Sequence, residues 1–257
     1  MDYLVICLAA LIGSALTLFS GFGLGTILVP VFALFFPIEV AIALTAIVHF
    51  LNNLFKIVLL GRHADWGVVL RFGIPALVAA YIGARVLLLF SGMEPVYEYS
   101  LWGKEWQVMP VKLIIAILMI VFAITDMVPR FSKISFDRKY LPVGGLLSGF
   151  FGGLSGNQGA LRSMFLVKAR LTKEAYIATG VFIAVLIDIS RITVYAAIFK
   201  TMGSELNYGL LISATLCAFA GAYIGSKLVK KITIETLRII VAVMLLVIAV
   251  GLGMGWI

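Results

Sequence analysis

The sequence has few charged residues for its length. Only 12% of its 257 residues are Asp, Glu, Lys or Arg, whereas 63% are hydrophobic. Soluble domains carry about 25% charged residues, because charged side chains cover their surfaces. The composition therefore excludes a soluble enzyme, a nucleic-acid-binding protein and a disordered protein. The formal net charge of +8 is typical of a membrane protein whose surplus Lys and Arg lie in cytoplasmic loops.

Features that would indicate other protein classes are also missing. The two cysteines, Cys7 and Cys217, lie in apolar segments without a CxxC or CxxH neighbour, so neither a disulfide framework nor a metal site is expected. No GxxxxGK[ST] loop occurs, so we expect no ATP-driven motor within the chain and no cofactor. The first residues, Met-Asp-Tyr, lack the basic charge of a signal peptide, so we expect the first apolar segment to stay in the mature chain.

Long apolar segments fill most of the sequence. A helix needs about 20 apolar residues to cross a bilayer. Six segments have this length: 40–60, 67–90, 109–128, 174–199, 208–226 and 236–256. Two further apolar regions, 3–36 and 140–168, are interrupted by glycine-rich stretches at 20–25 and 152–159. The sequence therefore predicts an all-α, multi-pass membrane protein whose longest polar stretches are 91–108 and 129–139.

The two halves of the sequence resemble each other. At an offset of 135 residues, the matched positions are Ser20-Gly21 with Ser155-Gly156, Glu39 with Glu174, Asn53 with Asp188, and Lys56 with Arg191. At an offset of 142, the Ala-Tyr-Ile-Gly sequence at 80–83 recurs at 222–225. We predict a first transmembrane repeat over 1–128, a cytoplasmic linker over 129–139 and a second repeat over 140–257. Internal repeats in a multi-pass membrane protein are typical of transporters.

Basic residues indicate how the segments cross the membrane. If each interrupted segment is a re-entrant helical hairpin, thirteen Lys and Arg residues lie on one side of the membrane and four on the other. If each interrupted segment crosses the membrane fully, about ten lie on one side and seven on the other. The positive-inside rule therefore favours hairpins. The thirteen are Arg62, Arg71, Arg130, Lys133, Arg138, Lys139, Lys168, Arg170, Lys173, Lys227, Lys230, Lys231 and Arg238. Three crossings follow each hairpin, so the repeats are inverted. These charges bear mainly on the second hairpin, and a full crossing is the alternative for the first.

The glycine-rich interruptions predict an anion site. Broken helices survive in a membrane only inside protein or beside a wet cavity, because unpaired backbone groups in hydrocarbon are costly. The second half-helices would begin near Gly25 and Gly159, and the N–H groups at helix N-termini favour anions. Alternatively, these glycines only allow close helix packing. The predicted substrate-binding residues at the two tips are Ser20, Gly21, Gly23, Gly25, Gly156, Asn157, Gln158 and Gly159.

Polar residues within the apolar segments are further candidates, because ionisable groups inside membranes are costly and usually functional. Four of them follow the spacing i, i+3, i+4, i+7 and share one helix face: His49, Asn52, Asn53 and Lys56. We assign substrate binding to Asn52 and Asn53. Coupling or gating is assigned to His49, Lys56, Asp188 and Arg191. The alternatives are a packing histidine, a lysine that extends to the membrane interface, and a structural Asp188–Arg191 ion pair.

Arg162 lies three residues after the second interruption, one turn into the half-helix. An unpaired guanidinium at that depth is costly, so its predicted partners are an anionic substrate, exposed hairpin carbonyls or Asp188. The guanidinium is a planar fork that suits two oxygens of an oxyanion. The matched position in the first repeat is Ile27, so the predicted substrate site is asymmetric.

Both interruptions carry motifs of a known family. Ser20-Gly21-Phe22-Gly23-Leu24-Gly25 followed by Pro30 resembles the first motif of the sulfite exporter TauE/SafE family, also called the 4-toluene sulfonate uptake permease family. The stretch 152–163 resembles a variant of its second motif, with Asn157-Gln158-Gly159 where many members have Gly-Gly-Gly and a proline. The resemblance covers essentially the whole chain. It implies a multi-pass transporter of sulfite, sulfoacetate or aryl sulfonates in the cell inner membrane or plasma membrane.

Together these features predict a secondary transporter, not an enzyme, that exports sulfite or an organosulfonate. The expected partners are the small anion and the lipid bilayer, without nucleic acid. A passive anion channel and a non-transporting scaffold are the alternatives. A remote third is an intramembrane serine protease, because Gly153-Leu154-Ser155-Gly156 has the form GxSG and a buried histidine is available.

Overall fold

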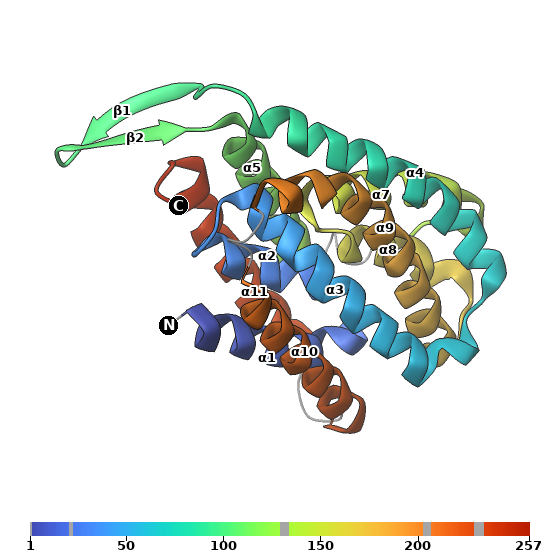
Figure 1. Ribbon diagram of the computed structural model, residues 1–257. Coiled ribbons are helices and arrows are strands. Elements are labelled where there is room, and N and C mark those ends of the chain that lie inside the picture. Colours follow the sequence, from blue (N-terminus) through green and yellow to red (C-terminus); the bar gives the residue numbers. More distant parts are fainter. Residues whose placement is uncertain (1, 21–22, 129–133, 203–206, 229–233) are drawn as a thin grey trace.

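The computed structural model describes residues 2–20, 23–128, 134–202, 207–228 and 234–257. Helices make up most of it (Figure 1). The first half of the chain contains α1 (Asp2–Ser20), α2 (Gly25–Ala33), α3 (Ile38–Leu60), α4 (Trp66–Ser91) and α5 (Pro110–Met127). The second half contains α7 (Leu141–Ser155), α8 (Gly159–Leu166), α9 (Lys173–Met202), α10 (Tyr208–Leu228) and α11 (Ile234–Gly253). Short 3-10 turns lie at Gly61–His63, Arg138–Tyr140 and Val167–Ala169.

The long helices coincide with the predicted apolar segments. Within the described ranges, four stretches are long and apolar enough to cross a membrane: 38–63, 66–91, 173–196 and 208–227. Shorter apolar stretches lie in α1, α5 and α11. The prediction of an all-α membrane protein is confirmed at this level.

The polar stretch 91–108 contains an element that the sequence reasoning missed. Strands β1 (Tyr97–Leu101) and β2 (Lys104–Val108) form an antiparallel hairpin. Trp102 and Gly103 connect them with φ values of 55° and 72°, as a two-residue turn with positive φ at both positions requires. The Tyr99 hydroxyl donates to the Met254 carbonyl at 2.7 Å, so this hairpin contacts the C-terminal residues.

Matched helices of the two halves pack in interchangeable pairs. Helix α1 lies along α10 and α4 along α7, while α3 packs on α9 and α5 on α11. The matched helices are α1 with α7, α3 with α9, α4 with α10 and α5 with α11. If each helix is exchanged for its match, the same set of pairs results. Glycines allow backbone contact within the first two pairs: a Cβ at Gly221 would lie 2.1 Å from the Leu11 carbonyl, and one at Gly149 would lie 2.2 Å from that of Ala76.

The helices on the two sides of each glycine-rich interruption lie close together. A Cβ at Gly144, near the start of α7, would lie 2.4 Å from the Phe165 ring, near the end of α8. The Phe136 N–H also donates to the Met164 carbonyl at 3.0 Å, so α8 returns to the end of the molecule at which α7 begins. In the first half, a Cβ at Gly13 would lie 3.1 Å from the Leu24 side chain, so the start of α2 lies beside the middle of α1.

Several of the described loops lie at two opposite ends of the molecule. At one end, Asp65 pairs with Arg138 at 3.3 Å and Asp137 with Lys168 at 3.9 Å, which joins the α3–α4, α5–α7 and α8–α9 connections. At the other end lie both termini and the β hairpin, on the left of Figure 1. The residues 134–139 of the predicted linker are thus on the same end as the loop after α8.

This arrangement predicts the sidedness of labelling in a protein without Cys7 and Cys217. Cysteines introduced at Asp137 and Arg170 should both react with an impermeant thiol reagent from the cytoplasmic side. Ser100→Cys, in the β hairpin, should react from the opposite side. Labelling of positions 137 and 170 from opposite faces would contradict the re-entrant arrangement.

Candidate functional site

The two glycine-rich tips lie against each other. A Cβ at Gly23 would lie 4.0 Å from the Gly159 Cα, and one at Gly25 would lie 2.8 Å from the Gly156 carbonyl oxygen. Gly23 and Gly156 have φ values of +100° and +79°, which other residues rarely adopt. Helices α2 and α8 begin here without a side-chain cap. Of the other predicted tip residues, Gly21 and the side chain of Ser20 lie outside the described part.

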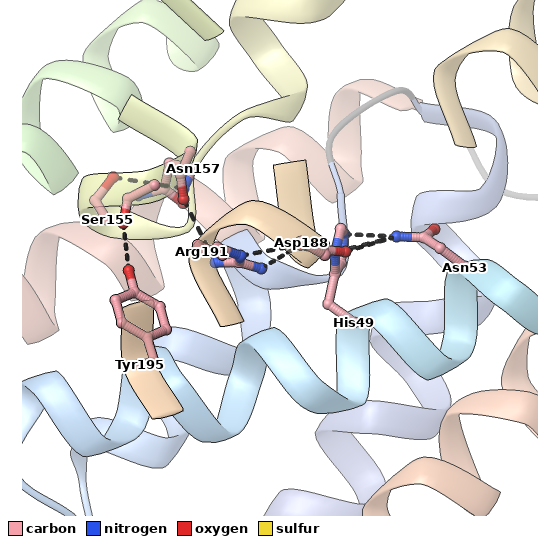
Figure 2. A network of polar contacts seen from close by, with 9 residues as sticks. His49, Asn53, Ser155, Asn157, Asp188, Arg191 and Tyr195 are labelled. Atoms are coloured by element: carbon pink, nitrogen blue, oxygen red, sulfur yellow. Dashed lines mark hydrogen bonds and ion pairs between the residues drawn. The ribbon is translucent and has the colours of Figure 1, made fainter. Parts of the chain in front are cut away.

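One carboxylate joins the two halves of the chain beside these tips (Figure 2). Asp188 Oδ2, from α9, lies 2.6 Å from His49 Nδ1 of α3 and accepts from Asn53 Nδ2 at 3.4 Å. Its other oxygen accepts from Arg191 Nε at 2.9 Å, and Arg191 Nη2 lies 2.7 Å from it. The considered Asp188–Arg191 ion pair is therefore present, whereas the contact of Asp188 with His49 was not predicted.

Arg191 also fixes the end of α7. Its Nη1 donates to the Gly152 carbonyl at 3.4 Å. The Tyr195 hydroxyl, one turn further along α9, donates to the Gly153 carbonyl. The Tyr195 bond gives the Gly153 carbonyl a partner at the C-terminal end of α7. The Gly152 carbonyl already accepts from the Gly156 N–H at 3.0 Å, and Arg191 is its second donor. Sequence reasoning missed Tyr195, although its position four residues after Arg191 places it on the same helix face.

Lys56 and Arg162 are buried without an acidic partner in the part of the chain that the structure describes. Their side chains are 5% and 9% exposed, so Lys56 does not extend to the surface. Lys56 Nζ lies 3.1 Å from the Asn52 side-chain oxygen in the amide orientation that also lets Asn52 donate to the Ala218 carbonyl. The Nη1 of Arg162 has no hydrogen-bond partner among the described residues. Asp188, one of the three partners predicted for Arg162, binds His49, Asn53 and Arg191 instead.

These groups meet in one small cavity of about 40 Å³. Its lining consists of Thr17, Gly23, Leu24, His49, Asn53, Lys56, Arg162, Leu166, Tyr176, Ile177, Gly180 and Val181, which include no acidic residue. The buried Lys, Arg, Asp and Glu side chains of the described chain are Lys56, Arg162, Arg191 and Asp188, whose formal charges sum to +2. Because burying an unbalanced charge is costly, an anion in this cavity would be strongly favoured.

The structure divides the predicted site residues into groups. Five line the cavity: Gly23, His49, Asn53, Lys56 and Arg162. Asp188 and Arg191 lie behind His49, and Asn52 contacts Lys56 and Ser14. The residues Gly25, Gly156, Asn157, Gln158 and Gly159 belong to the tips but not to the cavity lining. Asn157 Oδ1 and both side-chain polar atoms of Gln158 have no partner within the described ranges.

Sequence reasoning missed seven of the twelve lining residues, among them Thr17, Tyr176 and Gly180. Thr17 precedes the first interruption and is 5% exposed, and its hydroxyl has no partner among the described residues. Tyr176 and Gly180 lie one turn apart on α9 and belong to the same lining. A Cβ at Gly180 would lie 3.5 Å from Arg162 Nε, so a glycine leaves room for the guanidinium. The sequence signals that could have identified them are the polar Thr17 and the glycine Gly180 within apolar segments.

Ser155 has a backbone role. Its hydroxyl donates to the Phe151 carbonyl at 2.9 Å and accepts from the Asn157 N–H at 3.4 Å. His49, the buried histidine considered as its partner, has Nδ1 on Asp188. The geometry therefore gives no Ser–His pair for a protease within the described residues.

Comparison with known protein families decides the class. The family model of Sulfite exporter TauE/SafE matches residues 5–252. The chain belongs to the sulfite exporter TauE/SafE family. No curated protein matches the sequence. The predicted family resemblance is confirmed over both halves of the chain. This TauE/SafE protein is thus a multi-pass membrane protein of a family of transporters for sulfite and related anions.

In this TauE/SafE protein, Asp188→Asn should lower stability, because Arg191 stays buried without its counter-charge. Breaking a buried ion pair typically costs about 3–5 kcal/mol. Asp137→Asn is the control, since an exposed pair is worth about 1 kcal/mol or less. Thermal unfolding in detergent measures both, and Asp188→Asn combined with Arg191→Gln should recover part of the loss. Wild-type stability of Asp188→Asn would mean that the pair does not hold the helices together.

Proposed function

We propose that the chain is a secondary transporter that exports a small sulfur-containing oxyanion, sulfite or an organosulfonate, across the cytoplasmic membrane. The observation that carries this proposal is the shared cavity of Lys56 and Arg162, which has no acidic residue in its lining. A bound dianion would balance the buried charge of +2. The family supplies the chemical class of the anion.

The anion binds beside the two tips in this proposal. The Arg162 guanidinium holds two of its oxygens as a fork, and Lys56 contacts it as a point charge. The N-termini of α2 and α8 add the positive ends of their helix dipoles. A cavity of about 40 Å³ favours a compact anion such as sulfite over an aryl sulfonate, because about 10–15 Å³ of such volume holds one water, so only a few waters fit.

The membrane arrangement of the proposal is a pair of inverted repeats, each with a re-entrant hairpin and three crossings. It is supported by the interchangeable helix pairs and by the return of α8 to the end where α7 begins. With the end that carries Arg138 and Lys168 in the cytoplasm, the membrane potential favours exit of an anion. The gain is about 2.3 kcal/mol per charge for each 100 mV.

His49 is the proposed coupling residue. Its Nδ1 is held by Asp188, and the ring lines the cavity, where its Nε2 lies 3.7 Å from a Cβ built on Gly23. The charged groups around it are Asp188, Arg191, Lys56 and Arg162. A proton added to His49 places another positive charge beside the anion, so protonation and anion binding favour each other.

Arg162→Ala should bind sulfite about 10- to 150-fold more weakly, since a hydrogen bond to a charged group is worth about 1.5–3 kcal/mol. Arg162→Lys keeps the charge but loses the fork, so it should be partly defective. Because Arg162 does not bind Asp188, both variants should fold as the wild type does. Sulfite affinity in detergent and radiolabelled sulfite flux in proteoliposomes are the measurements, with exposed Arg71→Ala as control. Unchanged affinity in folded Arg162→Ala would remove this residue from the site.

The same flux assay separates the alternatives. A transporter should show saturable flux and faster exchange when sulfite is present on both sides of the membrane. A passive channel would conduct without such acceleration, and a scaffold would give no flux above protein-free liposomes.

His49→Gln should flatten the pH dependence of flux. In the wild type, affinity for the anion should rise as the pH falls through the range where His49 gains its proton. Titration of the anion itself affects both proteins equally, so the difference between the two pH profiles gives the contribution of His49. Identical profiles in two folded proteins would make His49 a packing residue.

A further inference from the structure

The cavity does not follow the symmetry of the two halves, although each half contributes six of its twelve lining residues. Six of its lining residues come from α8 and α9: Arg162, Leu166, Tyr176, Ile177, Gly180 and Val181. Leu166 ends α8, and Tyr176 lies in the first turn of α9, close to the loop that carries Lys168. The space between α8 and α9 therefore runs from the tips toward the end proposed to face the cytoplasm.

The first half contains matched positions, but none of them lines the cavity. With the offset of 135 residues, the matches are Ile27, Val31, Ala41, Ile42, Thr45 and Ala46. They lie on α2 and α3, and none is more than 8% exposed. The five apolar residues belong to the large apolar cluster of the molecule. The matched positions thus lie toward the opposite end, and their apolar side chains pack in this cluster instead of lining the cavity.

Thr45 is the one polar residue among these six matched positions. Its side chain is fully buried, and its hydroxyl has no hydrogen-bond partner among the described residues. It lies next to α2, because its Cγ2 is 3.9 Å from a Cβ built on Gly25. Its match is Gly180, which adjoins Arg162. A buried hydroxyl without a partner costs free energy, and this cost is explained if the hydroxyl meets water or the anion in another conformation.

We infer that the anion leaves through a second route between α2 and α3, which opens when the space between α8 and α9 closes, and that Thr45 is its polar contact. The inference rests on the proposed transport function. In inverted repeats, the second conformation arises when the two halves exchange their arrangements. The present structure is then the conformation that faces the cytoplasm.

Cysteine accessibility tests the route in a protein without Cys7 and Cys217. Thr45→Cys keeps the side-chain size and should react with an impermeant thiol reagent from outside when sulfite is supplied. Val181→Cys, in the present cavity, should react from the cytoplasmic side and be protected by sulfite. Ala43→Cys is the control, since Ala43 is fully buried on another face of α3 and should stay unreactive. Modification of position 45 should stop radiolabelled sulfite flux while binding from the cytoplasmic side persists.

Two outcomes separate this inference from the proposed function. Sulfite flux with an unreactive Thr45→Cys, and with an equally unreactive Ala41→Cys at the position matched to Tyr176, would overturn the route and leave transport intact. Absence of flux in the wild-type protein under all gradients would overturn the transport proposal itself, and the route with it.

Discussion

The buried carboxylate of Asp188 is the group on which the arrangement of charges depends. It is the only acidic side chain among the buried polar residues that the structure describes. Its two oxygens bind His49 and Asn53 on α3 and Arg191 on α9, so one group joins both halves of the chain. Because these contacts occupy it fully, Lys56 and Arg162 keep their charges for another partner. The cavity is thus positive because the carboxylate of Asp188 is bound outside it.

Glycine determines where that cavity lies. Backbone contact between the tips requires that Gly25 carry no side chain, because a Cβ there would lie 2.8 Å from the Gly156 carbonyl. The same residue type lets α4 and α7, and α1 and α10, approach to backbone contact. The tips therefore meet at the level of His49 and Asp188, so that helix N-termini, cations and hydrogen-bond donors from both halves converge.

The sequence predicted the helices because apolar length decides them locally, and it predicted where glycines interrupt them. The boundaries of α3 and α4 differ from the predicted segments by two residues or fewer. The His49–Asp188 contact joins residues 139 apart and depends on how α3 faces α9, which spacing along one helix does not determine. Yet Asn53 and Asp188 are matched positions that touch at 3.4 Å. The repeat alignment matched these two residues but did not predict that they touch. Asn157 and Gln158 were placed in the substrate site because they are polar, but the tip they occupy packs against α2 and α7.

The shortness of the two half-helices has an electrical consequence in the proposed membrane arrangement. Helices α2 and α8 have 9 and 8 residues, about 12–14 Å at 1.5 Å per residue, whereas the hydrocarbon core is about 30 Å thick. Water that reaches a tip from one side of the membrane keeps that tip close to the electrical potential of that side. The voltage then drops mainly across the thin layer of protein between the tips and the opposite surface. A movement of a few ångströms would carry the anion through most of the transmembrane field.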